Sequence, residues 1–496
     1  MNRALRRISI AVLVMFLLLL ININYLQGFE PASLADKPGN SRAFYAAQNS
    51  YERGSIVTSD GVTIAASRPS ADPNDSIKYQ RYYPDGPMFA PVTGYDTLYS
   101  QTGIEATENS LLSGSNSALT VRNFLDLLTG KPRKGATVTL TINSRAQAAA
   151  YNALAAFGKP GGVVAIDPRT GAILALASYP SYDPNTLATH DGVKLNQVDQ
   201  ALLSNPAQPL LNRALQETSP PGSTFKIVTS SALLTGNPSV TPQTNVASPT
   251  QLILPQTTHV LINNDGEACG NGSGQAPLIT AFAQSCDTTF GQIGENLGAA
   301  VLNAMAEKFG MNDPGLTIPL GAAASNYVIP NPPSQALTAF SAIGQFSDTV
   351  TPLQEAMFAA AIANNGTLKR PYLVQQVTAS DLSTVQTTSQ SVFSQPVSSS
   401  VASEVAQMML AVVQDSDGTA FNFNSSAEGG LVIAGKTGTA QNGVNNTGLN
   451  DAAFSCFAPF SNPQIAVGVI IRGGGYGAIA AAPIAVAVIK AFLRTP

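Results

Sequence analysis

The chain has 496 residues, which is enough for about two to four domains. Only 11% of the residues are charged, against roughly 25% in typical soluble proteins, so the surface must be rich in uncharged polar side chains. The net charge of −4, with no long basic run after residue 7, excludes the electrostatic footprint of a nucleic-acid-binding protein. Neither His190 nor His259 has ligand-like neighbours and the cysteines are scattered, so we expect no metal and no cofactor.

The N-terminus predicts a membrane anchor. Three arginines precede an apolar run that begins at Ile8 and extends, across two asparagines, to Leu26. A spanning helix needs about 20 such residues, and no small-residue cleavage site follows the run. We therefore expect residues 1–7 to be a cytoplasmic tail and residues 8–26 an uncleaved, single-pass transmembrane anchor in the cell membrane, with the remainder extracytoplasmic. A cleaved signal peptide is the alternative, and it would export the same remainder.

Export permits disulfide bonds. Cys269 and Cys286 lie 17 residues apart and flank a glycine-rich loop, so they are predicted to pair. Cys456 stands in the apolar run DAAFSCFAPF and is predicted to be a buried free thiol.

The first part of the exported chain carries little that resembles catalytic chemistry. Residues 27–50 are polar and predict a loosely ordered lead-in, and residues 51–70 predict a hairpin around the turn Asp60-Gly61. Short strands and a helical stretch at residues 104–114 follow. Residues 27–135 are therefore predicted to form a small spacer, or pedestal, domain.

From residue 136 the pattern changes to strand, helix, strand, strand. A helix is predicted from a Ser144 cap to Gly158, followed by two strands joined by the turn at residues 167–171. Helical stretches then dominate to about residue 430, and strands return in LVIAGKTGTAQ, AAFSCFAPF and IAVGVIIRG before a last helix. Strands at both ends predict one sheet covered by a central helical block, an α/β (α+β) domain over residues 136–496.

The first chemical motif is Ser223-Thr224-Phe225-Lys226. The preceding Pro-Pro-Gly stops any earlier helix, so Ser223 is predicted in the first turn of a new one. Residues three apart share a helix face, which places Lys226 roughly 5–6 Å from Ser223. A helix N-terminus favours an alkoxide and disfavours an ammonium, and both effects suit a serine activated by a neutral lysine. Alone, the pattern more often marks an N-cap serine with a surface lysine.

The second motif is Ser285-Cys286-Asp287, in which a hydroxyl could pass a proton between Lys226 and a leaving amine. By itself it usually marks a loop or a helix cap. The third is Lys436-Thr437-Gly438-Thr439, at the end of an apolar strand. A cation, two hydroxyls and a glycine on one strand suit an extended peptide that ends in a carboxylate. The plain alternative is a strand end before a polar turn.

Together the motifs resemble the SxxK, SxN and KTG set of penicillin-recognising serine enzymes. Over about residues 50–490 the chain is similar to class B penicillin-binding proteins, and most similar to the penicillin-binding protein A group of actinobacteria. The resemblance is carried by RGSIVTSDGVTIA, VVAIDPRTGAILALASYPSYDPN, LLNRALQETSPPGSTFKI, TPLQEAMFAAAIANNG and GKTGTAQ. It implies a transpeptidase domain with a five-stranded antiparallel sheet flanked by helices.

The resemblance also implies the chemistry. Ser223 would attack the penultimate carbonyl of a D-Ala-D-Ala stem peptide, Lys226 would take its proton, and Ser285 would relay a proton to the departing D-Ala. Lys436 would supply positive potential for the substrate carboxylate. The Thr437 and Thr439 hydroxyls would bind that carboxylate, beside Gly438, and the N–H groups of Ser223 and Thr439 would form an oxyanion hole.

The implied partners follow from that reaction. An amine from a neighbouring stem peptide would resolve the acyl-enzyme into a cross-link, and β-lactams would acylate Ser223 as mimics of the dipeptide. Proteins of division or elongation, such as a lipid II polymerase, are expected partners, because no glycan-polymerising region precedes the spacer.

Asp287 departs from the family pattern, which has Asn in this position. An Asn amide can donate a hydrogen bond to the acyl side chain of a substrate, and an ionised carboxylate cannot. Asp287 could instead pair with one of the two lysines and raise its pKa, which predicts slower acylation than an Asn version would show.

Three other functions compete with this interpretation of the sequence. A Ser-His-Asp triad lacks a histidine in a suitable context. A β-lactamase fits the same motifs but not the anchor and spacer. A non-catalytic division scaffold or antibiotic sensor, in which the serine is acylated without turnover, gains support from Asp287.

Overall fold

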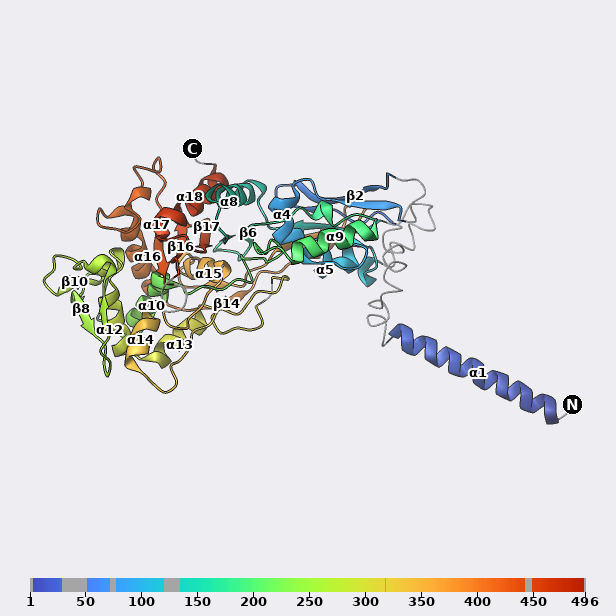
Figure 1. The fold of residues 1–496 in the computed structure, drawn as a ribbon, viewed down its shortest axis with the longest axis horizontal. Helices are drawn as coiled ribbons and strands as arrows, with labels where there is room; N and C mark the ends of the chain where they lie inside the picture. Colours follow the sequence, from blue (N-terminus) through green and yellow to red (C-terminus); the bar gives the residue numbers. More distant parts are fainter. Residues whose placement is uncertain are drawn as a thin grey trace.

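A computed structural model of the chain describes residues 3–28, 51–71, 77–119, 134–316, 318–441 and 448–494. Within these ranges a larger and a smaller domain make up the body of the elongated molecule, and helix α1 (Arg3–Gly28) stands apart at one end (Figure 1). The lead-in predicted from the sequence falls almost wholly on residues 29–50, which lie outside the described residues.

The larger domain is built on a five-stranded antiparallel sheet in the order β15-β16-β17-β5-β6. The strands are β5 (Gly161–Ile166), β6 (Ile173–Tyr179), β15 (Ala434–Ala440), β16 (Asp451–Ala458) and β17 (Ile465–Ile471). The prediction of one sheet made from the two ends of the domain is confirmed. All residues of β5, β16 and β17 are buried, which explains why their sequences are continuous apolar runs rather than alternating ones.

Helices cover both faces of this sheet (Figure 1). Helices α8 (Ser144–Phe157) and α18 (Ala482–Leu493) pack together on one face, and α15 (Pro352–Ala363) lies on the other. Almost every residue of α15 is buried, including Gln354 and Glu355, as expected for a helix whose other residues are apolar. The helical block is completed by α10 (Lys226–Gly236), α11 (Leu278–Ala283), α12 (Asp287–Leu297), α13 (Ala299–Lys308), α14 (Gln335–Ala342) and α16 (Ser399–Gln414).

One predicted helix cap was wrong. The N-cap of α8 is Asn143, whose side chain accepts a hydrogen bond from the Ala146 N–H at 3.1 Å. The Ser144 hydroxyl donates instead to Asp60 in the smaller domain, at 2.5 Å. The predicted end is confirmed, since Gly158 adopts the left-handed conformation that closes the helix.

The smaller domain contains a six-stranded sheet in the order β13-β12-β4-β1-β2-β3. The strands are β1 (Ile56–Val57), β2 (Thr63–Pro69), β3 (Tyr79–Tyr82), β4 (Thr137–Leu140), β12 (Val374–Thr378) and β13 (Thr384–Thr387). The predicted hairpin is confirmed by the antiparallel pairing of β1 with β2. Strands β12 and β13 come from the part of the chain that otherwise forms the larger domain. The predicted domain boundary at residue 135 therefore does not separate all the strands of this sheet from the larger domain.

A buried ion cluster holds the smaller domain together beside its helices α4 (Gly86–Thr93), α5 (Gly103–Thr107) and α6 (Asn109–Leu112). Glu105 on α5 bonds Arg53 at 2.7 Å and Arg81 at 2.5 Å, and all three side chains are at most 3% exposed. Burial alone would raise the pKa of Glu105, but the two guanidinium groups lower it below its usual value. The Glu105 carboxylate therefore links the three chain segments that carry Arg53, Arg81 and Glu105.

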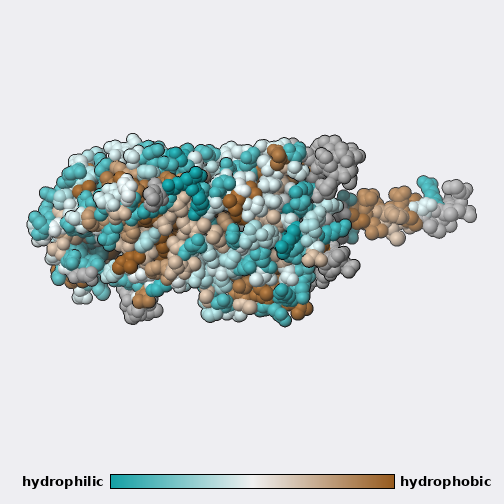
Figure 2. Space-filling model, turned by 90° about the horizontal axis from the view of Figure 1, so that it is seen from above, coloured by the Kyte–Doolittle hydropathy of each residue, from teal (hydrophilic) through white to brown (hydrophobic). Residues whose placement is uncertain are grey.

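Helix α1 exposes apolar side chains between Ile10 and Tyr25, which form the brown rod at one end of Figure 2. Within the described part of the chain, no helix reaches the combination of length and hydropathy that a membrane span requires.

A small lobe of short strands borders the helical block. Its paired strands are β7 (Asn245–Ala247) with β10 (Gln275–Pro277), and β8 (Gln251–Ile253) with β9 (Val260–Ile262). The remaining elements are α9 (Gly192–Leu203), β11 (Leu368–Lys369), β14 (Val392–Ser394) and α17 (Gly477–Ala480). Strands β8 and β9 contact α12, so the lobe packs against that helix.

Candidate active site

Ser223 lies in a 3₁₀ turn, Gly222–Phe225, that leads directly into α10. The predicted position at a helix start is confirmed. Gly222 has a φ of +55°, and a Cβ at this residue would lie 2.7 Å from the carbonyl oxygen of Thr439. Glycine therefore lets the turn approach the edge strand β15 closely enough to bring the first and third motifs together.

Lys226 lies behind Ser223 with its amino group among four oxygen atoms. Its Nζ is 2.9 Å from the Ser223 Oγ, 2.6 Å from Asp287 Oδ1, and 2.8 Å and 3.2 Å from the carbonyl and hydroxyl oxygens of Ser285. The Lys226 side chain has no exposed surface and also lies over the Phe290 ring, 5.5 Å from its centroid. The predicted contact between the serine and the lysine is therefore present.

Lys436 approaches the same place from β15. Its Nζ donates to the Ser285 Oγ at 2.8 Å and to the Thr437 carbonyl oxygen at 3.1 Å, over the ring of Phe282. The Ser285 hydroxyl thus lies between two amines. All three sequence motifs meet around Ser223, on elements that are far apart in the chain.

Burial shifts both lysines toward the neutral form. It lowers the pKa of Lys226, and the neighbouring Asp287 carboxylate offsets part of the effect. The pKa of Lys436 is lowered well below its usual value by burial and by the charge of Lys226, again with a partial offset from Asp287. A neutral amine one hydrogen bond from a hydroxyl is the arrangement that general-base activation of a serine requires.

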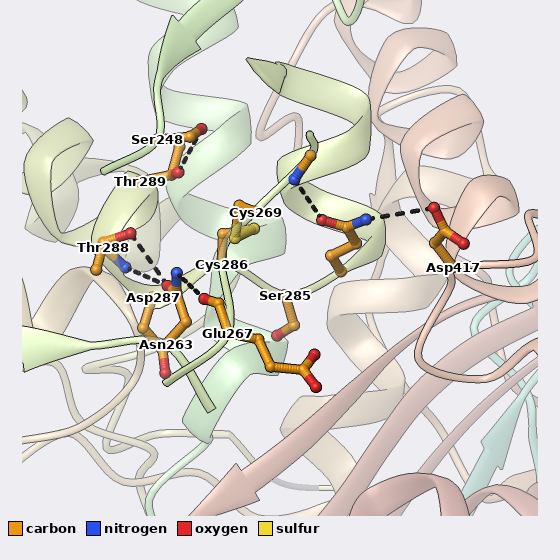
Figure 3. Close-up of a disulfide and its surroundings, with 12 residues drawn as sticks. Ser248, Asn263, Glu267, Cys269, Ser285, Cys286, Asp287, Thr288, Thr289 and Asp417 are labelled. Carbon is orange, nitrogen blue, oxygen red and sulfur yellow. Dashed lines mark hydrogen bonds between the residues drawn. A yellow bond between two sulfur atoms is a disulfide. The ribbon is translucent and has the colours of Figure 1, made fainter. Parts of the chain in front are cut away.

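The second motif is held by a disulfide. Cys286 is bonded to Cys269, as predicted, and the two Cα atoms are 6.1 Å apart (Figure 3). Cys286 is the N-cap residue of α12, Asp287 is its first residue, and Ser285 adopts a left-handed φ of +62°. Since non-glycine residues seldom adopt that conformation, the disulfide and the lobe around it must hold Ser285 in place.

The comparisons with known proteins agree with this geometry. Residues 161–490 match the penicillin binding protein transpeptidase domain, and residues 53–138 match the penicillin binding protein A dimerisation domain. The chain is 40% identical to the peptidoglycan D,D-transpeptidase PbpA of Mycolicibacterium smegmatis and 39% identical to that of Mycobacterium tuberculosis, over 100% of this chain and 99% of each relative.

Solved structures show the same relation. The ceftriaxone acyl-enzyme complex of penicillin-binding protein A from M. tuberculosis has a TM-score of 0.84 at 37% identity, covering 90% of this chain and 99% of that one. A D,D-transpeptidase domain from Eggerthella lenta has a TM-score of 0.75 at 32% identity, covering 90% and 98%. The chain belongs to the penicillin-binding protein transpeptidase family. The family assignment made from the motifs is confirmed.

In this penicillin-binding protein the third motif is supported by residues that the sequence did not point to. The Thr437 hydroxyl is 2.7 Å from that of Thr419, which follows α16, and Gln345 Nε2 donates to the Thr439 carbonyl oxygen at 3.3 Å. Thr437 is 7% exposed, whereas Thr439 is half-buried. Neither Thr419 nor Gln345 stands in a recognisable motif, so no local signal could have identified them.

A buried carboxyl group lies directly behind the serine turn. The Thr224 hydroxyl is 2.8 Å from the Pro221 carbonyl oxygen and 2.7 Å from Glu355 Oε1 on α15. Burial raises the pKa of Glu355 to about 8. Because a threonine has one hydroxyl hydrogen, a protonated Glu355 can donate to Thr224 while Thr224 donates to Pro221, which satisfies both short contacts.

Proposed function

We propose that this chain is a peptidoglycan D,D-transpeptidase that cross-links stem peptides through a Ser223 acyl-enzyme and is acylated by β-lactams. The observation that carries the proposal is the contact of the Ser223 hydroxyl with a fully buried Lys226, beside Ser285 and the edge strand that bears Lys436. Family membership and the acyl-enzyme complexes solved for the M. tuberculosis relative support it.

The reaction follows from these contacts. Neutral Lys226 accepts the Ser223 proton as the hydroxyl oxygen attacks the carbonyl between the last two D-Ala residues. The Ser285 hydroxyl, in contact with both amines, passes a proton to the departing D-Ala amine, and the acyl-enzyme remains. An acceptor amine then attacks the ester carbonyl, loses its proton through the same groups and releases Ser223.

Substrate binding is assigned to the edge strand. The hydroxyl groups of Thr437 and Thr439 would hold the terminal carboxylate of the donor, and Lys436 would act through its contact with the Ser285 hydroxyl. The N–H groups of Ser223 and Thr439 would stabilise the oxyanion. The Thr439 nitrogen lies close to the serine turn, because a Cβ on Gly222, the residue before Ser223, would lie 3.1 Å from it.

The proposed site of action is the outer face of the cell membrane, in cell-wall synthesis during division. The basic and apolar N-terminal sequence and the exposed apolar side chains of α1 support a single-pass anchor over residues 8–26. Residues 1–7 would remain in the cytoplasm, and a glycan polymerase acting on lipid II would be the expected partner.

A second candidate is a penicillin-binding sensor or scaffold that does not turn over. It is favoured by the 2.6 Å ion pair between Lys226 and Asp287, because the carboxylate stabilises the protonated form of the base. A base held in that form would accept the serine proton slowly.

One experiment separates the candidates. The chain is labelled with a fluorescent penicillin, and is separately given a D-Ala-D-Ala peptide with an acceptor amine. A stable label together with amide product supports the transpeptidase, and a stable label without product supports the sensor. A label that is hydrolysed within minutes would instead indicate a β-lactamase and would contradict both.

A further inference from the structure

The charged groups around Ser223 differ in what they present to a ligand. The side chains of Lys226 and Lys436 have no exposed surface. Asp287 keeps 26% of its side chain exposed, so it is the charge that a ligand meets among the described residues bonded to these lysines. The two amines thus lie beneath the site, and a carboxylate lies at its surface.

That carboxylate is close to the reacting atom. Asp287 Oδ1 and the Ser223 Oγ are bonded to the same nitrogen of Lys226, at 2.6 Å and 2.9 Å. Within the described part of the chain, the second carboxylate oxygen accepts no hydrogen bond. The side chain of an acyl group attached to Ser223 through an ester would therefore lie near this second carboxylate oxygen of Asp287, which is available to accept a hydrogen bond.

The carboxylate is also held in position. Cys286, the preceding residue, is bonded to Cys269. Thr288, the following residue, donates its N–H to the side-chain oxygen of Asn263 at 3.0 Å and its hydroxyl to the Pro249 carbonyl oxygen at 2.6 Å. Because both neighbours are fixed, Asp287 cannot readily move away from a ligand that it repels.

We infer that Asp287 is a specificity-determining residue, which favours acyl donors whose side chain carries an ammonium group on the carbon next to its amide carbonyl and disfavours donors with a carboxylate on that carbon. A carboxylate accepts hydrogen bonds but cannot donate them, and like charges repel across a few ångström in a partly buried site. The inference rests on the proposed function, because it concerns the acyl group that Ser223 receives. It concerns the side-chain end of the donor, whereas the terminal carboxylate is assigned to β15.

Three penicillins test the inference, because they share one nucleus and differ at the carbon next to the side-chain carbonyl. Ampicillin carries an ammonium there, benzylpenicillin no charge and carbenicillin a carboxylate. The rate constants for acylation are measured at about pH 6.5, where the ammonium is largely retained. The readout is the ampicillin-to-carbenicillin ratio in wild type divided by the same ratio in Asp287→Asn, since this quotient cancels the intrinsic reactivity of each drug.

We expect the ampicillin-to-carbenicillin ratio of the acylation rate constants to be about tenfold or more lower in Asp287→Asn than in wild type. The matched control is Glu267→Gln, which removes one negative charge from an exposed residue of the same lobe and should leave the ratio unchanged. An unchanged ratio in Asp287→Asn, or an equal fall in Glu267→Gln, would overturn the inference.

The outcomes also separate this inference from the proposed function. If no penicillin labels the wild type at Ser223, the proposed function fails. If all three label it with ratios that Asp287→Asn does not alter, the function stands and the specificity inference fails. Wild type alone gives an independent check, because added salt should reduce the preference for ampicillin. A preference that is insensitive to salt contradicts the inference, even if the variant does not fold.

Discussion

Two amines without exposed surface lie behind the half-buried hydroxyl of Ser223. Burial penalises the charge on each, and their mutual repulsion adds to that penalty at Lys436. Asp287 acts in the opposite direction on both. The fraction of Lys226 that is neutral at a given pH therefore depends on the balance between desolvation and one carboxylate.

Asp287→Asn should move the acid limb of the acylation pH profile to lower pH. The carboxylate raises the pKa of Lys226, so its removal leaves more of the base neutral at about pH 7, and each unit of pKa gives about tenfold in rate on that limb. The measurement is the pH dependence of the rate constant for acylation by benzylpenicillin. A limb that stays in place, or moves to higher pH, would show that Asp287 does not control the base.

Glu355→Gln should remove part of the pH dependence of stability. Glu355 has a folded-state pKa of about 8 against an ordinary 4.5, so between these values the folded state holds a proton that the unfolded state lacks. The free energy of unfolding should fall as pH rises through this interval, by about 1.4 kcal/mol per pH unit for one such group. Burial also raises the pKa of Asp348 to about 8, so Asp348 should still contribute its own part of the pH dependence of stability in the Glu355→Gln variant.

Urea unfolding at about pH 5 and about pH 8 measures this effect. The wild type should lose more stability between the two conditions than Glu355→Gln loses. Equal losses would indicate that Glu355 is ionised in the folded protein.

At the level of secondary structure, the site lies where the Gly222–Phe225 turn, the start of α12 and the edge strand β15 come together. The disulfide joins the start of α12 to the glycine-rich loop, and so positions Ser285 and Asp287. Replacing Cys269 and Cys286 by Ser should lower the free energy of unfolding by about 3 kcal/mol for a loop of this size. It should also slow acylation, because the left-handed Ser285 loses its constraint.

Thiol treatment supplies the control for this prediction. Dithiothreitol should slow acylation of the wild type to the rate of the double variant and leave the variant unchanged. A double variant that acylates at the wild-type rate would show that the lobe alone positions the motif.

The ion cluster of the smaller domain makes a separate prediction. Glu105→Ala leaves the buried Arg53 and Arg81 without their carboxylate, which should cost about 3–5 kcal/mol of unfolding free energy. Glu52→Ala is the control, because its pair with Lys134 is largely exposed and should contribute at most about 1 kcal/mol. Equal losses in the two variants, measured by urea unfolding, would contradict a structural role for the cluster.

At the scale of the whole molecule, local patterns predicted what depends on local structure. The apolar strands of the five-stranded sheet, the end of α8 at Gly158 and the helix start at Ser223 follow from residues near each other in the chain. The addition of β12 and β13 to the sheet of the smaller domain could not be predicted, because that pairing joins Val374–Thr378 to Thr137–Leu140 across the chain. The same holds for Thr419 and Gln345, which meet β15 only through the fold.

The most direct test of the whole account is to map the penicillin adduct by mass in the wild type and in Ser223→Ala. We expect a single covalent adduct in the wild type, on the peptide that contains Ser223, and no adduct in the variant. Capture of the drug by another residue, or an adduct that persists in Ser223→Ala, would contradict it.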